Sequence, residues 1–162
     1  GFAKVECENL AKKYSKDVNS IGLRIFAAYG PGEEEKKNLS SIINLWLNDA
    51  QKNISPLIFG DGTQTRDFIF IDDTISAILN SAEVSQNNII NVGSGVSTSF
   101  NQIIEKISAI TGKKIIPEYV KKEFAYVENL QADTKLMKSI LKINPISIDS
   151  GIEKFAQYLK II

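Results

Sequence analysis

The chain has 162 residues, with 19 acidic and 19 basic side chains and a formal net charge of zero. This length suits one domain with its own core, and the charge balance argues against nucleic acid or a membrane surface as the main partner. With no histidine and a single cysteine, Cys7, the sequence excludes an internal disulfide, histidine-dependent nucleophiles and the usual zinc sites. Acid–base chemistry must therefore use lysine, tyrosine or carboxylates, and the lone thiol fits a reducing, cytoplasmic compartment.

The first third of the chain predicts two helices separated by a strand. Residues 2–15 have apolar side chains roughly on one side, and residues 20–27 read as a buried strand that the turn at 29–32 ends. The charged run 33–37 predicts a solvated loop, and residues 38–52 predict the second helix. The expected apolar face of that helix comprises Leu39, Ile42, Ile43, Trp46 and Leu47.

Short strands and a third helix are expected in the middle of the chain. The strands are predicted at 56–59, 67–71 and 88–92. Asp72 or Asp73 is expected to cap the helix that follows the second strand. The expected core-facing residues of this helix are Ile75, Ile78, Leu79 and Ala82.

The last part of the chain adds two helices and a strand. Ser99 and Gln102 predict a capping box at the start of one helix, and Ser150 with Glu153 predicts the start of the other. Residues 114–119 read as a strand between them. The expected core-facing residues of the two helices are Phe100, Ile103, Ile104, Ile107 and Ile110, then Ile152, Phe155, Ala156 and Leu159. Strands that alternate with helices favour an α/β fold with a parallel sheet.

The start of the chain suggests that residues precede it. Gly1 is not a methionine, and the sequence contains no glycine-rich dinucleotide-binding loop. The first helix leads into an apolar strand, whereas a parallel sheet with this start would normally have earlier strands. We therefore expect the chain to be the later part of a larger enzyme.

Five segments carry a resemblance to one enzyme family. They are Gly1–Lys4, Leu23–Gly32, Gly60–Asp73, Asn91–Gly95 and Ala132–Lys135. The first resembles the end of a Tyr-x-x-x-Lys motif, the second Leu-Arg-x-Phe-Asn-x-Tyr-Gly-Pro, and the third Gly-x-Gly-x-x-x-Arg-Asp-Phe-x-x-Val-x-Asp. In this order they resemble the C-terminal part of an extended short-chain dehydrogenase/reductase, in the NAD-dependent nucleotide-sugar epimerase/dehydratase family.

The resemblance implies a fold and an activity. Residues 1–30 and 70–95 would complete a Rossmann-type parallel sheet that binds NAD or NADP. Residues 31–69 and 96–162 would belong mainly to a smaller α/β substrate-binding domain. The intact enzyme, a homodimer through its helix at 2–15, would remove and return a hydride on the sugar of a nucleotide-diphosphate sugar, as in the interconversion of UDP-glucose and UDP-galactose. This chain alone would be inactive.

The resemblance also implies cofactor-binding residues. Lys4 would hold the nicotinamide ribose and lower the pKa of a catalytic tyrosine one position before Gly1, because a nearby cation favours the phenolate. Ile25, Phe26 and Ala28 would lie beside the nicotinamide. Without the resemblance, Lys4 would read as a solvated lysine on a helix.

Arg66 is the strongest candidate for a contact to the substrate. A planar guanidinium suits two phosphate oxygens, and the resemblance places Arg66 on the diphosphate. The alternative is an ion pair with a neighbouring aspartate, Asp67, Asp72 or Asp73. Lys121 or Lys122 would serve the phosphate where many relatives have an arginine. The other implied substrate contacts are Ala27, Asn38, Leu39, Leu57 and Phe59.

Some of these residues have plainer explanations. Asn38 could be a helix N-cap, Phe59 could be ordinary core, and Asp133 could cap a helix. Ala27 stands where the family often has an asparagine, and alanine cannot donate to a sugar. A second hypothesis therefore stays open, in which the chain belongs to a non-catalytic nucleotide-binding or sensor protein. The residue before Gly1 separates the two hypotheses, since a tyrosine there supports the enzyme.

Overall fold

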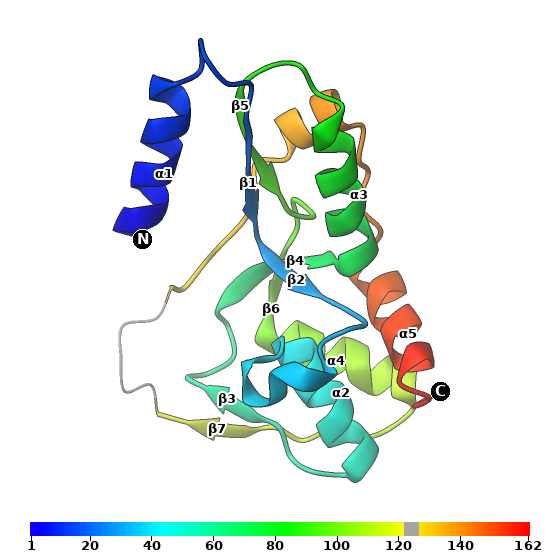
Figure 1. Ribbon diagram of the computed structural model, residues 1–162. Coiled ribbons are helices and arrows are strands. Elements are labelled where there is room, and N and C mark those ends of the chain that lie inside the picture. The colour runs from blue at the N-terminus through cyan, green and yellow to red at the C-terminus, as the bar shows by residue number, and fades with distance from the viewer. Residues whose placement is uncertain (122–126) are drawn as a thin grey trace.

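Helices and short strands alternate along the chain in a computed structural model that describes residues 1–121 and 127–162 (Figure 1). The elements are α1 (Phe2–Lys13), β1 (Ile21–Ile25), β2 (Ala27–Tyr29), η1 (Glu34–Leu39), α2 (Ile42–Lys52), β3 (Leu57–Phe59), β4 (Thr65–Phe70), α3 (Ile71–Ala82), β5 (Asn88–Val92), β6 (Ser97–Ser99), α4 (Phe100–Thr111), β7 (Glu118–Val120), η2 (Met137–Leu141) and α5 (Ile148–Tyr158). The expected α/β fold is confirmed. None of the described helices has the length and apolar character needed to cross a bilayer.

The strands form three small sheets. β1 pairs with β5 in parallel, and β3 pairs with β7 in parallel. The third sheet has the order β2-β4-β6, where β2 is parallel to β4 but β6 is antiparallel to it. The expected parallel pairing is confirmed for β1 with β5, β2 with β4 and β3 with β7, whereas the antiparallel strand β6 was not predicted. β6 consists of the polar residues Ser97–Ser99, so no apolar pattern in the sequence predicted it.

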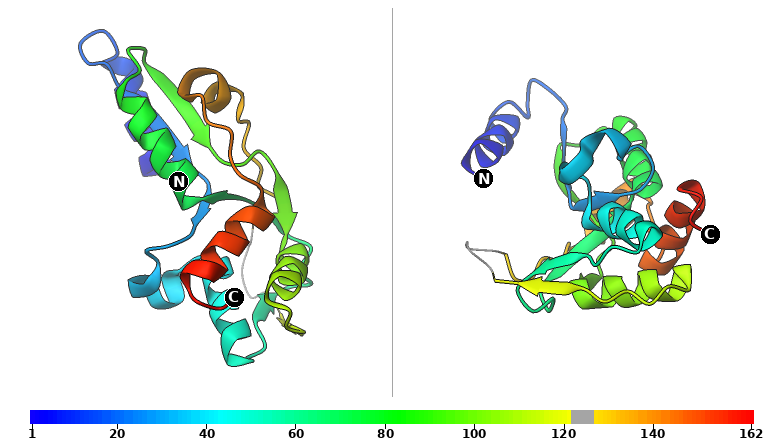
Figure 2. Two further views of the ribbon diagram at one scale, coloured as in Figure 1. Left: turned by 90° about the vertical axis from the view of Figure 1, so that its right-hand side faces the viewer. Right: turned by 90° about the horizontal axis from the view of Figure 1, so that it is seen from below.

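Two clusters of buried side chains hold the chain together. The larger lies where α2, α4 and α5 meet β2, β3 and β4, and the rings of Trp46 and Phe100 meet edge to face there, 5.5 Å apart. The smaller joins α3, β5 and η2 through Ala77, Ile90 and Met137. The helix α1 contributes no buried residue to either cluster. Figure 1 and the right-hand view of Figure 2 show it set apart from the other elements.

Three helix starts differ from those expected. Ser41, not Asn38, caps α2, so Leu39 lies outside the helix and is 89% exposed. Ser147, not Ser150, caps α5. Phe70 precedes α3, and its aspartates lie in the first turn with no side-chain cap. The capping box of Ser99 and Gln102 is confirmed.

The face that α3 turns to the sheets is also not the one expected. Thr74 and Ala77 are buried, whereas Ile75, Ile78 and Leu79 are 47%, 45% and 64% exposed, and Ala82 is exposed too. α3 packs against β1, β2 and β4, and its buried residues are the small Thr74 and Ala77. The apolar stripe of α3 therefore points outward.

Two further expectations about the first third of the chain are wrong. The strand at 20–27 is broken at Phe26 into β1 and β2, and it is not deeply buried, since Ile25 is 46% exposed. The charged run 33–37 is not all solvated, because Glu33 is only 4% exposed. The helix η2, at Met137–Leu141, follows Asp133, where the sequence predicted that a helix begins.

A contact between Tyr29 and Gly151 fixes α5 on the central sheet. The Tyr29 ring is buried between Phe68 and Phe70, and its hydroxyl donates a hydrogen bond to the Ile148 carbonyl at 3.4 Å. A Cβ atom on Gly151 would overlap that hydroxyl. The glycine therefore lets the helix lie directly against the phenol.

We expect Gly151→Ala to destabilise the protein by about 1–3 kcal/mol through overpacking. An alanine inside an α-helix normally stabilises it, so the sign of the change is diagnostic. Urea denaturation measures it, and the cost should shrink in a Tyr29→Phe background, where the overlapping oxygen is gone. A stabilised Gly151→Ala variant would contradict this packing.

Candidate functional site

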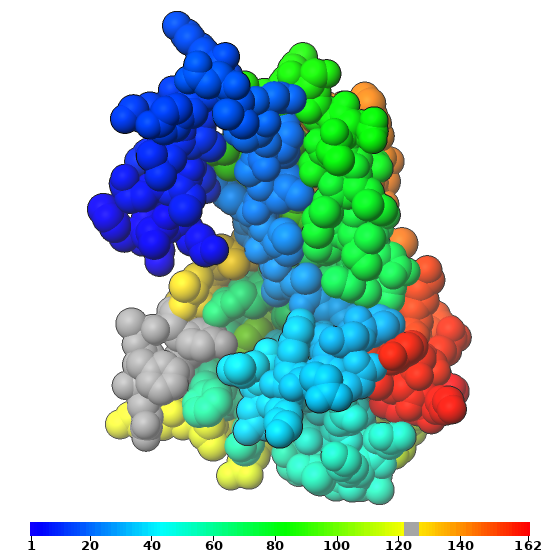
Figure 3. Space-filling view, in the orientation of Figure 1, coloured from blue at the N-terminus to red at the C-terminus, as the bar shows by residue number. Residues whose placement is uncertain are grey.

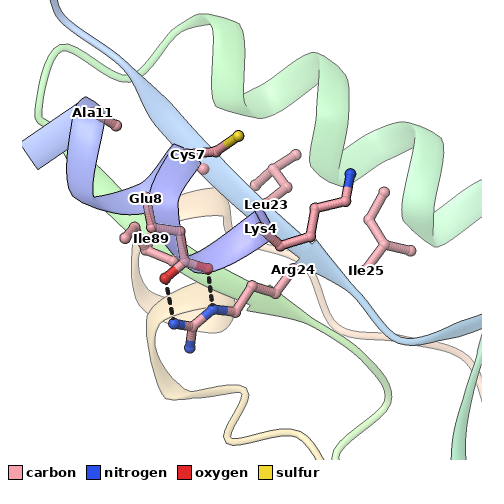
Figure 4. Close-up of a pocket in the computed structure, with 9 residues that line it drawn as sticks. Lys4, Cys7, Glu8, Ala11, Leu23, Arg24, Ile25 and Ile89 are labelled. Atoms are coloured by element: carbon pink, nitrogen blue, oxygen red, sulfur yellow. Dashed lines mark hydrogen bonds and ion pairs between the residues drawn. The ribbon is translucent and has the colours of Figure 1, made fainter. Parts of the chain in front are cut away.

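A hollow of about 510 Å³ lies between α1 and β1 (Figure 4). Lys4, Cys7 and Glu8 line it from the helix, and Leu23 and Ile25 line it from the strand. The structure thus brings together two of the residues expected on the cofactor side, Lys4 and Ile25. In the space-filling view, α1 is a separate ridge beside β1 (Figure 3).

An ion pair crosses this hollow. The guanidinium of Arg24 donates from Nε to Glu8 Oε1 at 2.7 Å and from Nη2 to Glu8 Oε2 at 2.6 Å. The hydrogen bond from Arg24 lowers the pKa of the Glu8 carboxyl. Neither residue was selected from the sequence as a site residue, although Arg24 lies inside the Leu23–Gly32 segment and Glu8 one helical turn after Lys4.

The expected cofactor-side residues lead directly to the strand that carries Arg66. Phe26 donates its backbone N–H to the Val92 carbonyl at 2.9 Å, which ties the break after β1 to the end of β5. Ala27 and Ala28 then pair with Phe68 and Ile69 of β4. Arg66 lies two residues before Phe68, so β2 and β4 place Arg66 close to Ala27.

Arg66 is half-buried on the strand β4. Its Nη1 donates to the Thr65 carbonyl at 2.7 Å, and its guanidinium carbon lies 5.7 Å from the centre of the Phe100 ring. This distance allows a cation–π interaction that orients the side chain. Between described residues, no ion pair joins Arg66 to the aspartate that follows it in β4 or to either aspartate of α3.

Asp67 is fully buried and accepts four hydrogen bonds from two other segments. Its Oδ1 accepts from the N–H and the hydroxyl of Ser94 at 2.6 and 2.7 Å. Its Oδ2 accepts from the N–H groups of Gly95 and Ala132, each at 2.9 Å. Gly93 lies so close that a Cβ atom there would overlap Ala132 and press on the carboxyl. From the sequence, Asp67 was considered only as an ion-pair partner for Arg66. Its position as an acidic residue inside an apolar strand was the available signal for a buried structural role.

A second, open hollow of about 620 Å³ lies between the turn after β3 and the end of β7. Gly60, Asp61 and Tyr119 contribute to its wall. Leu57 and Phe59 precede it on one face of β3 and are 51% and 43% exposed, while Ile58 between them is buried. Phe59 is therefore not ordinary core.

Asn101, at the start of α4, braces this second hollow. Its Nδ2 donates to the Asp61 carbonyl and its Oδ1 accepts from the Tyr119 hydroxyl, both at 3.0 Å. The close approach of Asn101 to Gly62 leaves no room for a side chain at that glycine. No pattern in the sequence indicated a role for Asn101, since an asparagine in a first helical turn is common.

The exposed residues Asn38 and Leu39 lie on η1, in a loop that Glu33 fastens at both ends. The Glu33 carboxylate accepts from the Gly30 N–H at 3.0 Å, and from the Ser41 N–H and hydroxyl at 2.6 and 2.8 Å. These hydrogen bonds hold the two ends of the loop that carries Asn38 and Leu39 in place. Lys122, the other expected substrate contact, lies outside the described residues.

Two remaining polar groups have structural roles. Asp133 Oδ1 accepts from the Lys135 N–H at 3.0 Å, which stabilises the turn before η2. The Tyr29 phenol is buried, and burial raises its pKa, so it stays protonated and is a poor acid–base candidate. Over the described ranges, no three metal-ligating side chains gather at one point.

A family model described as "NAD dependent epimerase/dehydratase family" matches residues 1–93. The chain belongs to this family. It is 36% identical over 149 residues to a UDP-glucuronate 4-epimerase from Thermodesulfobacterium geofontis, an alignment that covers 91% of the chain and 44% of that relative. The chain spans about half the length of the curated relatives it matches.

Solved structures of the family share this fold. The UDP-glucose 4-epimerase of Thermotoga maritima with UDP-glucose superposes with a TM-score of 0.91 at 25% identity, over 99% of this chain and 52% of that one. The UDP-glucuronic acid 4-epimerase of Bacillus cereus with UDP-glucuronic acid and NAD gives 0.80 at 28% identity, over 94% and 49%. The resemblance seen in the sequence is thereby confirmed.

We expect Asp67→Asn to destabilise the protein because the new amide N–H₂ would face N–H donors in place of an accepting oxygen. Each buried donor left without an acceptor costs about 1–3 kcal/mol. Thermal or urea denaturation measures the loss. Asp17→Asn removes the same charge at an exposed position and should change little; equal effects of the two variants would contradict the role of the buried carboxylate.

Proposed function

We propose that this chain supplies the substrate-binding portion of an NAD-dependent nucleotide-sugar epimerase or dehydratase. The observation that carries the proposal is that Ile25 lines the hollow beside Lys4, while Ala27, two residues later, pairs with Phe68 on the strand that also carries Arg66. A cofactor bound beside Lys4 and Ile25 and a phosphate-containing substrate bound at Arg66 would lie next to each other. That arrangement suits hydride exchange between a nicotinamide and a sugar.

Within this proposal, residues 1–30 and 70–95 extend a sheet that binds NAD, and residues 31–69 and 96–162 mainly bind substrate. NAD, when bound, accepts a hydride from the sugar and returns it. Lys4 would hold the nicotinamide ribose and lower the pKa of a tyrosine preceding Gly1. Ile25, Phe26 and Ala28 would form the wall beside the nicotinamide.

The substrate would bind along the strands β4 and β3. Arg66 would grip the diphosphate, aided by Lys122, with its guanidinium held in place by the Phe100 ring. Leu57 and Phe59 would flank the nucleobase, since both are exposed on the same face of β3. Asn38 and Leu39 would contact the substrate from η1, and Ala27 would contact the sugar without donating a hydrogen bond.

The sensor hypothesis rests on Ala27, which stands where the resemblance leads us to expect an asparagine. A protein that binds the nucleotide sugar without transforming it would need Arg66 but not a catalytic tyrosine. The encoded residue before Gly1 and the turnover of UDP-glucose by the full-length protein separate the two functions. We propose that the 162-residue chain alone turns over no nucleotide sugar.

We expect Arg66→Ala in the full-length protein to weaken UDP-glucose binding by about 1.5–3 kcal/mol, the usual value of a charged hydrogen bond. Arg66→Lys should recover part of the loss, because lysine keeps the charge but not the planar fork. Calorimetry measures both, and NAD affinity should be unchanged. Lys52→Ala, which removes an exposed cation from the end of α2, is the control. Unchanged UDP-glucose affinity in Arg66→Ala would assign the guanidinium a structural role.

We also propose that the chain associates with a second copy through α1, whose apolar residues Phe2, Val5 and Leu10 are 81%, 52% and 52% exposed. Multi-angle light scattering of the 162-residue chain should show self-association at micromolar concentration. Leu10→Glu should weaken it by placing a charge in the contact, whereas Ile162→Glu, at the other end of the chain, should not. A clean monomer at that concentration would contradict the interface.

A further inference from the structure

The helix α1 has few of the contacts that normally fix a helix on a sheet. None of its residues is buried, and apolar packing therefore contributes little to its orientation. Its C-terminal end is tied down indirectly: Asn87 donates from Nδ2 to the Ser15 carbonyl at 2.8 Å and accepts from the Ser20 N–H at 2.7 Å. Among the described residues, the constraint on the N-terminal half, which carries Lys4, comes from an ion pair with β1.

The pair of Glu8 and Arg24 supplies that constraint. Its two hydrogen bonds join both carboxylate oxygens to two nitrogens of one planar guanidinium. A bidentate pair fixes direction as well as distance, unlike a contact between point charges. Glu8 keeps only 20% of its side chain exposed, against 54% for Arg24, so the carboxylate sits on the side of α1 that faces β1.

The geometry of the helix carries this constraint to Lys4. Residues four apart lie on the same face of an α-helix, one turn from each other, so Lys4 and Glu8 share a face. Figure 4 shows Lys4 beside the end of β1, in the hollow that the ion pair crosses. A rotation of α1 about its axis would move the Lys4 amino group sideways, and the bidentate pair opposes that rotation.

We propose that Glu8 and Arg24 are positioning residues that hold Lys4 over the end of β1. The inference rests on the proposed function, in which Lys4 acts on the cofactor and on the neighbouring tyrosine. Exposed ion pairs contribute little to global stability. Loss of the pair should therefore lower turnover far more than it lowers the stability of the fold.

The structural part of the inference is tested by hydrogen–deuterium exchange on the 162-residue chain carrying Leu10→Glu, so that the self-association proposed through α1 does not protect the amides of this helix. In Glu8→Gln, the amides of α1 should exchange several-fold faster, while those of β5 and α4 keep their rates. Glu6→Gln is the matched control, because Glu6 lies on the same helix and bonds to Asn9 within it. Unchanged exchange in α1, or equal acceleration in every element, would overturn the inference.

The functional part is tested on the full-length protein with saturating NAD and UDP-glucose as the probe substrate. Glu8→Gln should lower kcat by about 10- to 100-fold with an unchanged KM, since misplacement of a catalytic group by about 1 Å can cost about 100-fold. The charge-swapped double variant Glu8→Arg/Arg24→Glu should recover most of the loss seen in either single variant, because it restores a bidentate pair. Glu6→Gln should retain the parent kcat.

The pH profile of kcat distinguishes positioning from simple loss of folded protein. When Lys4 no longer faces the tyrosine, the phenol pKa rises and the acidic limb should move to higher pH, both in Glu8→Gln and in Lys4→Met. A smaller fraction of folded enzyme would lower the profile without moving its limb. If the acidic limb of the pH profile moves in Lys4→Met but stays in place in Glu8→Gln, the positioning role of Glu8 is overturned and the proposed function is not. An unchanged kcat in Lys4→Met overturns the proposed function, and the positioning role with it.

Discussion

The buried carboxylate of Asp67 is the interaction on which the remaining architecture depends. It joins three segments that are far apart in sequence: the strand β4, the turn after β5 and the stretch that leads to η2. Four N–H and O–H groups converge on its two oxygens, so a charge that would be costly to bury alone is fully solvated by the protein. The neighbouring Arg66 side chain lies on the other face of the strand, because successive side chains alternate. A rigid anchor on one face thus fixes the strand that presents the guanidinium on the other.

Local sequence rules located most elements and the best-patterned helices. The capping box at Ser99 predicted the start of α4, and the spacing of Ile103, Ile104 and Ile107 predicted its buried face. These predictions hold because the cap and the apolar period are properties of the helix itself. The order of the motifs predicted the family for a related reason, because the residues of each motif suit the turn or strand in which that motif lies.

The errors arose where a distant segment decided the outcome. Ile75 and Ile78 form a regular apolar stripe, yet they are exposed and Ala77 is buried, because α3 packs on the strands through its small side chains. Glu33 looked solvated within its charged run, but Ser41 supplies two donors from eight residues away. For the candidate site, the motif residues could be selected from the sequence, whereas the residues that hold them, such as Asn101 and the Glu8–Arg24 pair, depend on contacts that only the folded chain reveals.

The crowding beside Asp67 has a consequence for sequence variation. Gly93 and Ala132 approach each other from separate segments, and the space between them is too small for even one additional methyl group. The two positions thus behave as one steric unit, in which enlarging either residue displaces the Ala132 N–H from the carboxylate. Homologues that keep the aspartate should keep small residues at both positions together. A joint restriction to small residues at positions 93 and 132, which are 39 residues apart (132 − 93), would then indicate the buried Asp67 carboxylate from sequences alone.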